Sequence, residues 1–364
     1  MKKIIWIGVI IVVIASANFL LKKNVSVDDE SIKIGAVLPL SGDVADIGQE
    51  VNRGAELAVD IARQNGLNIL YIPEDDVLNP VKSVSASQKL TSVDKVGSVF
   101  TLAGEEALPM VSVFNTAKIP LLVAWDSSAR LKEASPYIYS IGFSNEATGE
   151  KMASYMRNEL KLSKVAIVSL IDEVGDTMVS AFTKKFTSLG GAVVSTDKIQ
   201  PTMTDFRSII LKIKSEKAEG VYLGLFPPGH SLFAVQKKQL GLNVPAGGPD
   251  ITDSDIVQGG ASIEGTYMTY IWSDNIDFLV EQYKKKFGKE PASALYATFG
   301  YDSVTVLIEA SLKAKKDGIS IKDALRQIKT DKTTTPVDMK GTNFSERVER
   351  IYRIENGKRV LMIK

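Results

Sequence analysis

A single histidine, His230, is present in the chain of 364 residues, directly after Pro227-Pro228-Gly229 at the end of a predicted strand. A Ser-His-Asp triad would need this imidazole as its general base, and a metal centre with several histidine ligands is excluded by the count. The alternative is an ordinary polar side chain on a loop or in the first turn of a helix. We expect this alternative for His230.

Other signatures of catalysis are missing from the sequence. The G-x-S-x-G elbow, the phosphate loop G-x-x-x-x-G-K-[ST] and the dinucleotide pattern G-x-G-x-x-G do not occur. With no cysteine, the chain has no disulfide, thiol nucleophile, thiolate metal site or lipid-anchor cysteine. Acidic residues are plentiful, so a two-carboxylate hydrolase stays open, although nothing singles out such a pair. We predict a protein that is not an enzyme and has no cofactor or metal.

Composition and charge indicate a globular chain without a nucleic-acid partner. The sequence is 45% hydrophobic and 24% charged, and 44 basic residues balance 43 acidic ones. A net charge of +1 provides no broad field for attracting nucleic acid. The length is enough for two domains with full cores.

The first 30 residues have the pattern of an export signal. Lys2 and Lys3 precede an apolar run of 18 residues, 4–21, and a polar stretch follows. Ala15-Ser16-Ala17 offers a cleavage site after Ala17. At ~1.5 Å per residue, however, the run reaches about 27 Å, which also suits an uncleaved membrane anchor. Both alternatives place residue 31 onward outside the cytoplasm.

Strands and helices alternate along most of the chain, which is typical of a parallel sheet covered on both faces. In the first run, predicted strands occupy 33–38, 68–73, 96–102 and 119–124, and helices occupy 48–65, 81–92 and 108–117. In a second run, strands occupy 164–171, 192–199, 220–226 and 264–272, with helices at 148–160 and 177–189 and another capped by Asp205.

The remaining tail is mostly helical, at 277–288, 295–315 and 321–329, and ends in a hairpin at 351–363 around Asn356-Gly357. The pattern predicts an α/β fold of two doubly wound parallel-sheet lobes joined by crossover strands, with a ligand cleft between them. We assign 31–145 plus 273–335 to lobe 1, and 146–272 plus 336–364 to lobe 2.

Several segments resemble, in order, the branched-chain amino-acid-binding (Leu/Ile/Val-binding) receptors of ABC transporters, which are type I periplasmic solute-binding proteins. The opening segment 32–42, IKIGAVLPLSG, and the helix containing NRGAELA at 52–58 carry the resemblance most specifically. Later matching pieces are 119–122, 189–194, 205–206, 247–250, 264–265 and 301–302, so the resemblance spans 32–363.

The resemblance implies a set of ligand-binding residues. In that family, backbone N–H groups and small hydroxyls of lobe 1 hold a carboxylate, and an acid of lobe 2 meets an ammonium group. On this mapping, Ala103-Gly104 is the first carboxylate loop. Ser127 lies in the second loop, where Asp126 just before it is expected to offer its carbonyl, and Asp250 is the ammonium-binding acid. The candidates are Ser41, Ile47, Ala103, Gly104, Glu105, Trp125, Asp126, Ser127, Val174, Phe226 and Asp250.

Some positions depart from the family's pattern or allow two interpretations. Glu105 and Glu106 stand where small polar residues are usual. Acids in a first helical turn are favoured by its dipole, but one facing the cleft would disfavour a carboxylate and favour a cationic or neutral solute. Trp125 is either a cleft wall or core. Asp250 either binds ligand or caps a local turn, and Gly247-Gly248 before it favours binding.

The resemblance thus implies an extracytoplasmic receptor, expected to be monomeric, that captures a small polar solute and delivers it to an ABC permease. An amino acid or related compound is the expected solute. An anchored sensor or protein-interaction module of the same fold is the alternative.

Overall fold

The computed structural model describes residues 31–363 except 272–274 and 348. The predicted signal or anchor, residues 1–30, lies outside the described residues. Within the described ranges, no helix has the combined length and hydropathy that a membrane crossing requires.

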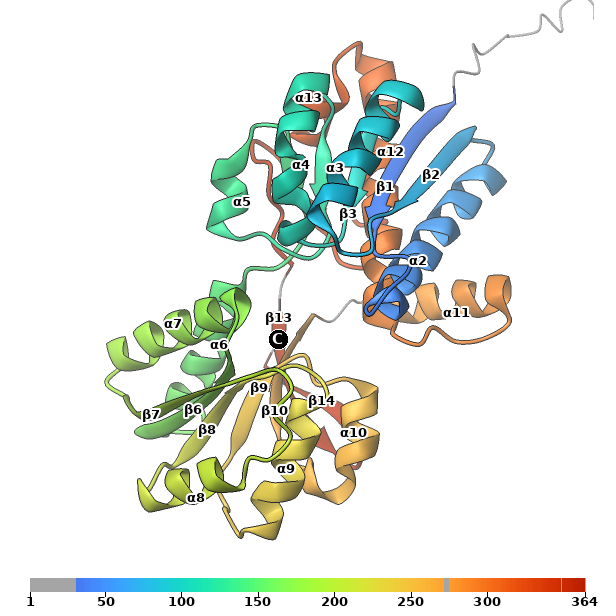
Figure 1. Ribbon diagram of the computed structural model, residues 1–364. Helices are drawn as coiled ribbons and strands as arrows, with labels where there is room; N and C mark the ends of the chain where they lie inside the picture. Colours follow the sequence, from blue (N-terminus) through green and yellow to red (C-terminus); the bar gives the residue numbers. More distant parts are fainter. Residues whose placement is uncertain (1–30, 272–274, 348, 364) are drawn as a thin grey trace, which may run out of the picture. The chain divides into compact units, whose positions relative to one another are not determined.

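The first sheet is wholly parallel, with the strand order β2-β1-β3-β4-β5 (Figure 1). Its strands are β1 (Ile32–Leu38), β2 (Ile69–Asp75), β3 (Ser98–Thr101), β4 (Leu121–Val123) and β5 (Ile138–Ser140). The connecting helices are α2 (Ala45–Gln64), α3 (Pro80–Gln88), α4 (Gly104–Ala117) and α5 (Ala129–Ala134). One π-helical turn, η1 (Lys89–Val93), continues α3, so the helix predicted at 81–92 is two elements.

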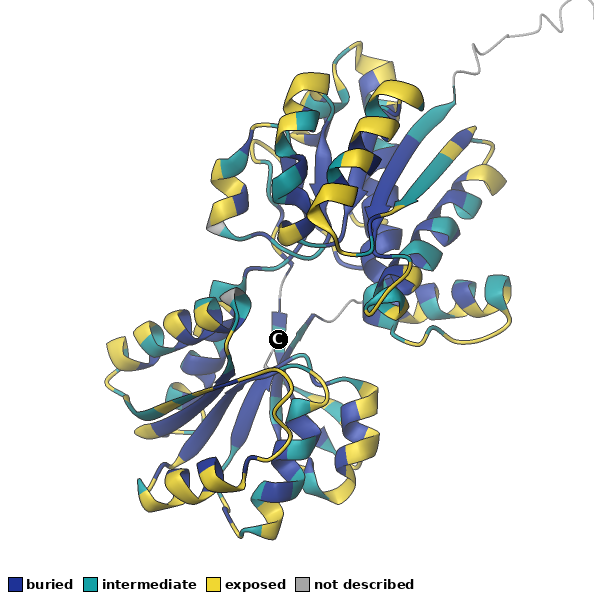
Figure 2. Cartoon of the chain, viewed as in Figure 1, coloured by how far each residue is buried: buried dark blue, intermediate teal, exposed yellow. Residues whose placement is uncertain are grey.

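The two faces of this sheet enter separate hydrophobic clusters because side chains alternate along a strand. Ile34, Ala36 and Leu38 of β1 pack in the cluster that contains α2, whereas Val37 packs in the cluster with α3 and α4. The edge strand β2 is only partly buried, whereas β1 from Ile34 onward and the whole of β3, β4 and β5 are buried, drawn dark blue in Figure 2. Burial on both faces explains why these strands are continuous apolar runs.

The second sheet has seven strands, in the order β14-β13-β10-β9-β8-β6-β7. Five strands are parallel: β6 (Lys164–Leu170), β7 (Ala192–Ile199), β8 (Gly220–Gly224), β9 (Ala246–Pro249) and β10 (Tyr267–Ile271). Their helices are α6 (Asn145–Asn158), α7 (Glu173–Ser188), α8 (Arg207–Ser215), α9 (Gly229–Gln239) and α10 (Asp253–Gly259), followed by the 3₁₀ turn η2 (Gly260–Ser262). One cluster joins α6 and α7 to the sheet, and another joins α8 and α9.

An antiparallel hairpin of β13 (Glu349–Glu355) and β14 (Lys358–Ile363) completes this sheet against β10. Asn356 and Gly357 have φ angles of 52° and 68°, as a two-residue type I′ turn requires. The hairpin predicted around this residue pair is therefore present, and its first strand begins two residues earlier than expected.

The helical tail packs into the core of the first sheet. It comprises α11 (Ile276–Phe287), α12 (Ala294–Asp317) and α13 (Ile321–Leu325), followed by the short pair β11 (Lys329–Thr330) and β12 (Val337–Asp338). Helices α2 and α12 approach closely because each has a glycine at the contact. A Cβ atom at Gly54 would lie 1.9 Å from the Ala297 carbonyl oxygen, and one at Gly300 would lie 1.8 Å from that of Val51.

A buried ion pair connects α12 to the segment that leads into the hairpin. The guanidinium of Arg347 lies 2.8 Å from the Asp302 carboxylate, which also accepts hydrogen bonds from the backbone and hydroxyl of Thr334. Arg347 also donates to the Ile141 carbonyl oxygen. The chain thus crosses from the second sheet to the first and back again.

The predicted fold class, two α/β units with doubly wound parallel sheets, is confirmed, with local corrections. Asp205 is not the N-cap of α8, because Phe206 occupies that position; Asp205 instead accepts a hydrogen bond from the Arg207 amide. Residues 247–249, which precede Asp250 in a segment that resembles the family's, form most of strand β9, and Asp250 follows at its end. The predictions omitted β5, α5, α9 and α10, which are short or lack a clear apolar period.

Candidate functional site

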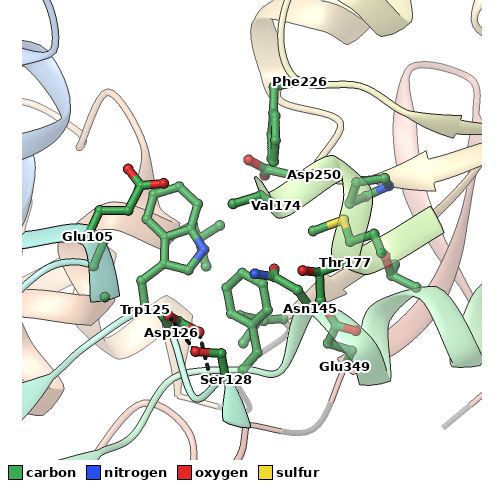
Figure 3. Close-up of a pocket in the computed structure, with 18 of the residues that line it drawn as sticks. Glu105, Trp125, Asp126, Ser128, Asn145, Val174, Thr177, Phe226, Asp250 and Glu349 are labelled. Atoms are coloured by element: carbon green, nitrogen blue, oxygen red, sulfur yellow. Dashed lines mark hydrogen bonds between the residues drawn. The ribbon is translucent and has the colours of Figure 1, made fainter. Parts of the chain in front are cut away.

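A cavity of about 560 Å³ is lined by residues that follow strands of both sheets. They come from the carboxyl ends of β3 and β4 in the first sheet and of β6, β8 and β9 in the second, and from α2, α12, β10 and β13. The crevice beyond the carboxyl ends of parallel strands is the usual ligand site of open α/β sheets. Of the predicted residues, Ile47, Ala103, Gly104, Glu105, Trp125, Asp126, Val174, Phe226 and Asp250 line this cavity (Figure 3).

The start of α4 separates two neighbouring acids into different environments. Glu105 is exposed and lines the cavity, whereas Glu106 is 2% exposed and lies beneath the helix. One Glu106 carboxylate oxygen accepts hydrogen bonds from the Thr101 hydroxyl and from the amides of Leu102 and Ala103. Burial, helped by the charge of nearby Asp76, raises the pKa of Glu106 to about 7. The helix-terminus interpretation therefore suits Glu106, and Glu105 is the acid that faces the cavity.

Gly104 is the first residue of α4, where backbone N–H groups have no intrahelical partner. A Cβ atom at this position would lie 2.3 Å from Oδ2 of Asp126. The glycine thus lets the loop after β4 approach the start of α4, and only its backbone N–H is available to a ligand.

Trp125 is both a wall of the cavity and part of the core. Its ring stacks on Phe299 with a centroid separation of 5.6 Å and also contacts Tyr296 and Phe143. Phe143 and Tyr296 line the cavity as well, so one aromatic group forms much of this wall. Trp125 therefore lines the cavity with one part of its surface and packs against the core with another, so the two interpretations are not exclusive.

The loop after β4 presents Ser128, not the predicted Ser127, to the cavity. Asp126 accepts hydrogen bonds from the amide and hydroxyl of Ser128, at 2.8 and 3.1 Å, as the dashed lines in Figure 3 show. This turn directs Ser127 inward, where it is fully buried and its amide donates to the Phe143 carbonyl. The Asp126 carbonyl, expected to be available to a ligand, accepts a hydrogen bond from the Ser140 hydroxyl.

Ser41 also lies outside the cavity lining. Its backbone amide and hydroxyl both donate to the carboxylate of Asp75 at the end of β2. The serine therefore closes the turn after β1, which explains its place in the sequence without a ligand.

Asp250 lines the cavity at the end of β9 with a φ of 44°. This left-handed conformation is uncommon for a residue with a side chain, and such residues gather at functional sites. Its Oδ2 atom is buried and has no hydrogen-bond partner among the described residues. Burial raises the pKa of Asp250 to about 6, with Asp255 adding to the shift and Arg359 opposing it.

Sequence reasoning missed Glu349, the first residue of β13, whose carboxyl also lines the cavity. The side chain is 8% exposed, and one oxygen accepts a hydrogen bond of 2.8 Å from the Thr148 hydroxyl. Its other oxygen, Oε2, is buried without a partner among the described residues. Burial raises the pKa of Glu349 to about 7, against the Thr148 hydrogen bond and the Lys151 charge, and the charge of Asp250 adds to the rise.

His230 lies in the first turn of α9, as expected, but it is buried and is not among the residues that line the cavity. A Cβ atom at Gly248 would lie 2.8 Å from its Nε2 atom, so the imidazole packs directly beneath β9. Burial lowers the pKa of His230 to about 4. The imidazole therefore supports the strand that ends at Asp250.

The arrangement suits the binding of a small polar solute. Aromatic and aliphatic walls surround a few convergent carboxyl groups, as in typical ligand pockets. Within the described ranges, no group of three or more His, Asp or Glu residues is placed to hold a metal ion. A buried carboxyl without a hydrogen-bond partner destabilises the folded protein, and a ligand that donates a hydrogen bond to it offsets that cost.

Two doubly wound sheets with a cavity at their carboxyl ends define the class of two-lobed solute-binding receptors. The chain belongs to the periplasmic binding protein family, whose model matches residues 31–357. This family consists of extracytoplasmic solute-binding proteins, so the predicted resemblance is confirmed.

Individual relatives agree on the fold and differ in what they bind. The chain is 26% identical to the Leu/Ile/Val-binding protein BraC3 of Rhizobium johnstonii, over 90% of this chain and 92% of that protein. It is similar in structure to the branched-chain amino-acid-binding protein LivJ of Streptococcus pneumoniae in complex with isoleucine, with a TM-score of 0.79, 21% identity and coverage of 92% and 99%. A benzoate complex of an R. palustris solute-binding protein has a TM-score of 0.75, with 23% identity and coverage of 92% and 96%.

Proposed function

We propose that this protein is a receptor that captures a small polar solute, an amino acid or a related compound, and delivers it to an ABC permease. The observation that carries the proposal is the Oδ2 atom of Asp250, which is buried at the cavity without a hydrogen-bond partner among the described residues. A charged hydrogen bond from an ammonium group would satisfy it. The named relatives that bind branched-chain amino acids support an amino acid or a similar compound as the solute.

The proposed roles of the other residues follow from their positions. Glycine at 104 leaves backbone N–H groups at the start of α4 for an anionic or polar end of the solute, and Ser128 supplies a hydroxyl. Trp125 and Phe226, on opposite walls, cover the apolar part of the solute. A solute that contacts residues of both sheets binds a closed state better than an open one, so binding favours closure.

A thermal-shift screen of the full chain, unfolded and refolded to remove any ligand carried through purification, tests this proposal. The panel contains neutral, acidic and basic amino acids, amides, polyamines and benzoate. A solute at ~100 times its dissociation constant stabilises the folded protein by about 2.7 kcal/mol, which gives a clear rise in melting temperature. If no member of the panel raises the melting temperature, the proposal is rejected.

A further inference from the structure

Glu349 is built into the cavity wall in a way that the fold does not require. One carboxyl oxygen is bound by Thr148, whereas Oε2 is buried and has no partner among the described residues. An unpaired buried carboxylate is costly, and a purely structural position would be served by an apolar side chain. Glu349 therefore has one hydrogen-bond acceptor, Oε2, to which no group among the described residues donates.

A basic residue, Lys151, contacts the Glu349 main chain and does not hydrogen-bond to Oε2. Lys151 of α6 donates to the main-chain carbonyl of Glu349, and its charge favours the ionised carboxyl. Lys151 does not line the cavity. The buried oxygen Oε2 thus has no donor among the described residues, and a solute in the cavity that Glu349 lines can supply one.

The charges that line the cavity are predominantly negative. Carboxyl groups of Glu105, Asp126, Asp250 and Glu349 face it, against one guanidinium, that of Arg130. An adjoining hollow of about 370 Å³ shares Asp250 with the cavity and adds further carboxyl groups, those of Asp46, Glu50 and Asp253, beside Arg359. A cleft lined mainly by one sign of charge concentrates counter-ions, here cations.

Aromatic rings around the carboxyl groups further favour organic cations. Trp125, Phe143, Phe226, Tyr270 and Tyr296 line the same cavity. Ring faces attract ammonium and guanidinium groups, and the attraction strengthens when water is excluded. Carboxyl groups between aromatic walls therefore fit a solute with positively charged ends and an apolar middle.

We propose that Glu349 is a second cation-binding group of the cavity and that the solute carries two cationic amine-type groups, one held by Asp250 and the other by Glu349. This inference rests on the proposed receptor function and narrows its solute class. Free diamines and dibasic amino acids share this chemistry. The negative charge of the cavity disfavours amino acids with a single amine, because their other charged group is a carboxylate.

Calorimetric titration of the full-length protein with matched solutes tests the inference. 1,4-Diaminobutane is compared with butylamine, and lysine with norleucine, so that each pair differs by one amine. The wild type is expected to bind the diamino member of at least one pair at least tenfold more tightly, and the pair that responds distinguishes a diamine from an amino acid. Glu349→Gln, which keeps an acceptor for Thr148, is expected to abolish this preference by lowering the affinity for the diamino member to about that for its monoamine partner.

Glu290→Gln is the matched control, because it removes the same charge from a side chain that is 66% exposed and pairs with Lys284. The control is expected to leave every affinity unchanged. Tighter binding of norleucine, leucine or benzoate than of either diamino solute would overturn the inference and leave the receptor function standing. An unchanged diamine preference in Glu349→Gln would also overturn it. Failure of every solute to bind would instead reject the receptor function.

Discussion

The two walls of the cavity treat their acidic residues differently. On the wall from the first sheet, Glu105 is exposed and Asp126 is bonded to Ser128 in its own turn. On the wall from the second sheet, Asp250 and Glu349 each keep a buried oxygen without a partner among the described residues. Water or the chain satisfies the first pair, so the second pair gains most from a ligand.

This difference predicts that the wall from the second sheet contributes most of the affinity. The wall from the first sheet should affect mainly the rate of association. A buried carboxyl exchanges little water when it binds a cation, so its hydrogen bond is strong. An exposed carboxyl is screened by solvent and salt, and its contribution is small. Substitutions on the two walls should therefore have effects of different size.

Asp250→Asn is expected to have the largest effect. The asparagine keeps the shape of the side chain but removes the charge, and a hydrogen bond to a charged group is worth about 1.5–3 kcal/mol. Affinity for an amine-bearing solute should fall roughly 10- to 100-fold, measured by calorimetric titration. Asp205→Asn is the control, because that carboxylate is 63% exposed and pairs with Arg207 at the surface. Equal affinities for the two variants would remove Asp250 from the site.

The sequence predicted the fold well because its elements are long and strongly patterned. Buried parallel strands such as β1 are continuous apolar runs between turn residues, and Asn356-Gly357 specifies its own hairpin. Short elements such as β5, with three residues, lack enough pattern to be recognised.

The site was predicted less completely because tertiary structure decides which side chain faces the cavity. Ser127 and Ser128 are equivalent in type, and only the turn formed by the Asp126 carboxylate distinguishes them. Glu349 precedes the apolar alternation that marked the hairpin, and its hydrogen-bond partner Thr148 lies 201 positions away. Strand β13 also contains Arg350, Arg353 and Glu355, so a further acid at its start carried no distinctive signal in the sequence.

The affinity for a diamine should fall about tenfold as the pH falls from about 8 to about 6. Glu349 and Asp250, with pKa values of about 7 and about 6, become protonated in this range and lose their attraction for cations. Glu349→Gln should remove the part of the change near pH 7 and leave the part near pH 6. Titrations at several pH values measure both, and an affinity that rises as the pH falls would contradict the expectation.

Other charged groups near the two acids do not reverse this sign. Lys151 and the neighbouring Arg350 face the Glu349 segment, and Arg359 and Asp255 act on Asp250. Burial lowers the pKa of Lys151, and the charge of Glu349 opposes that shift. Tyr270 and Tyr296, which interact with Asp250, have pKa values raised by burial and stay neutral.

Ser128→Ala is expected to weaken binding moderately, whereas Ser127→Ala should not change it. The Ser128 hydroxyl lines the cavity and donates to Asp126, so its oxygen is left to accept a hydrogen bond from the solute. The substitution removes that hydrogen bond to the solute, which is worth about 0.5–1.5 kcal/mol. Ser127 is fully buried, with its amide bound to Phe143. Calorimetric titration of both variants with the same solute gives the comparison, and a larger effect for Ser127→Ala would return that residue to the site.

Glu105→Gln should have the smallest effect, about twofold in affinity, because exposed charge pairs contribute about 0–1 kcal/mol. The loss should appear mainly in the association rate and should vanish at high salt, since screening removes the attraction between an exposed carboxylate and an approaching cation. Stopped-flow binding at low and high ionic strength measures this. A loss as large as that of Asp250→Asn, persisting in salt, would show that Glu105 holds the solute directly, and the distinction between the two walls would then fail.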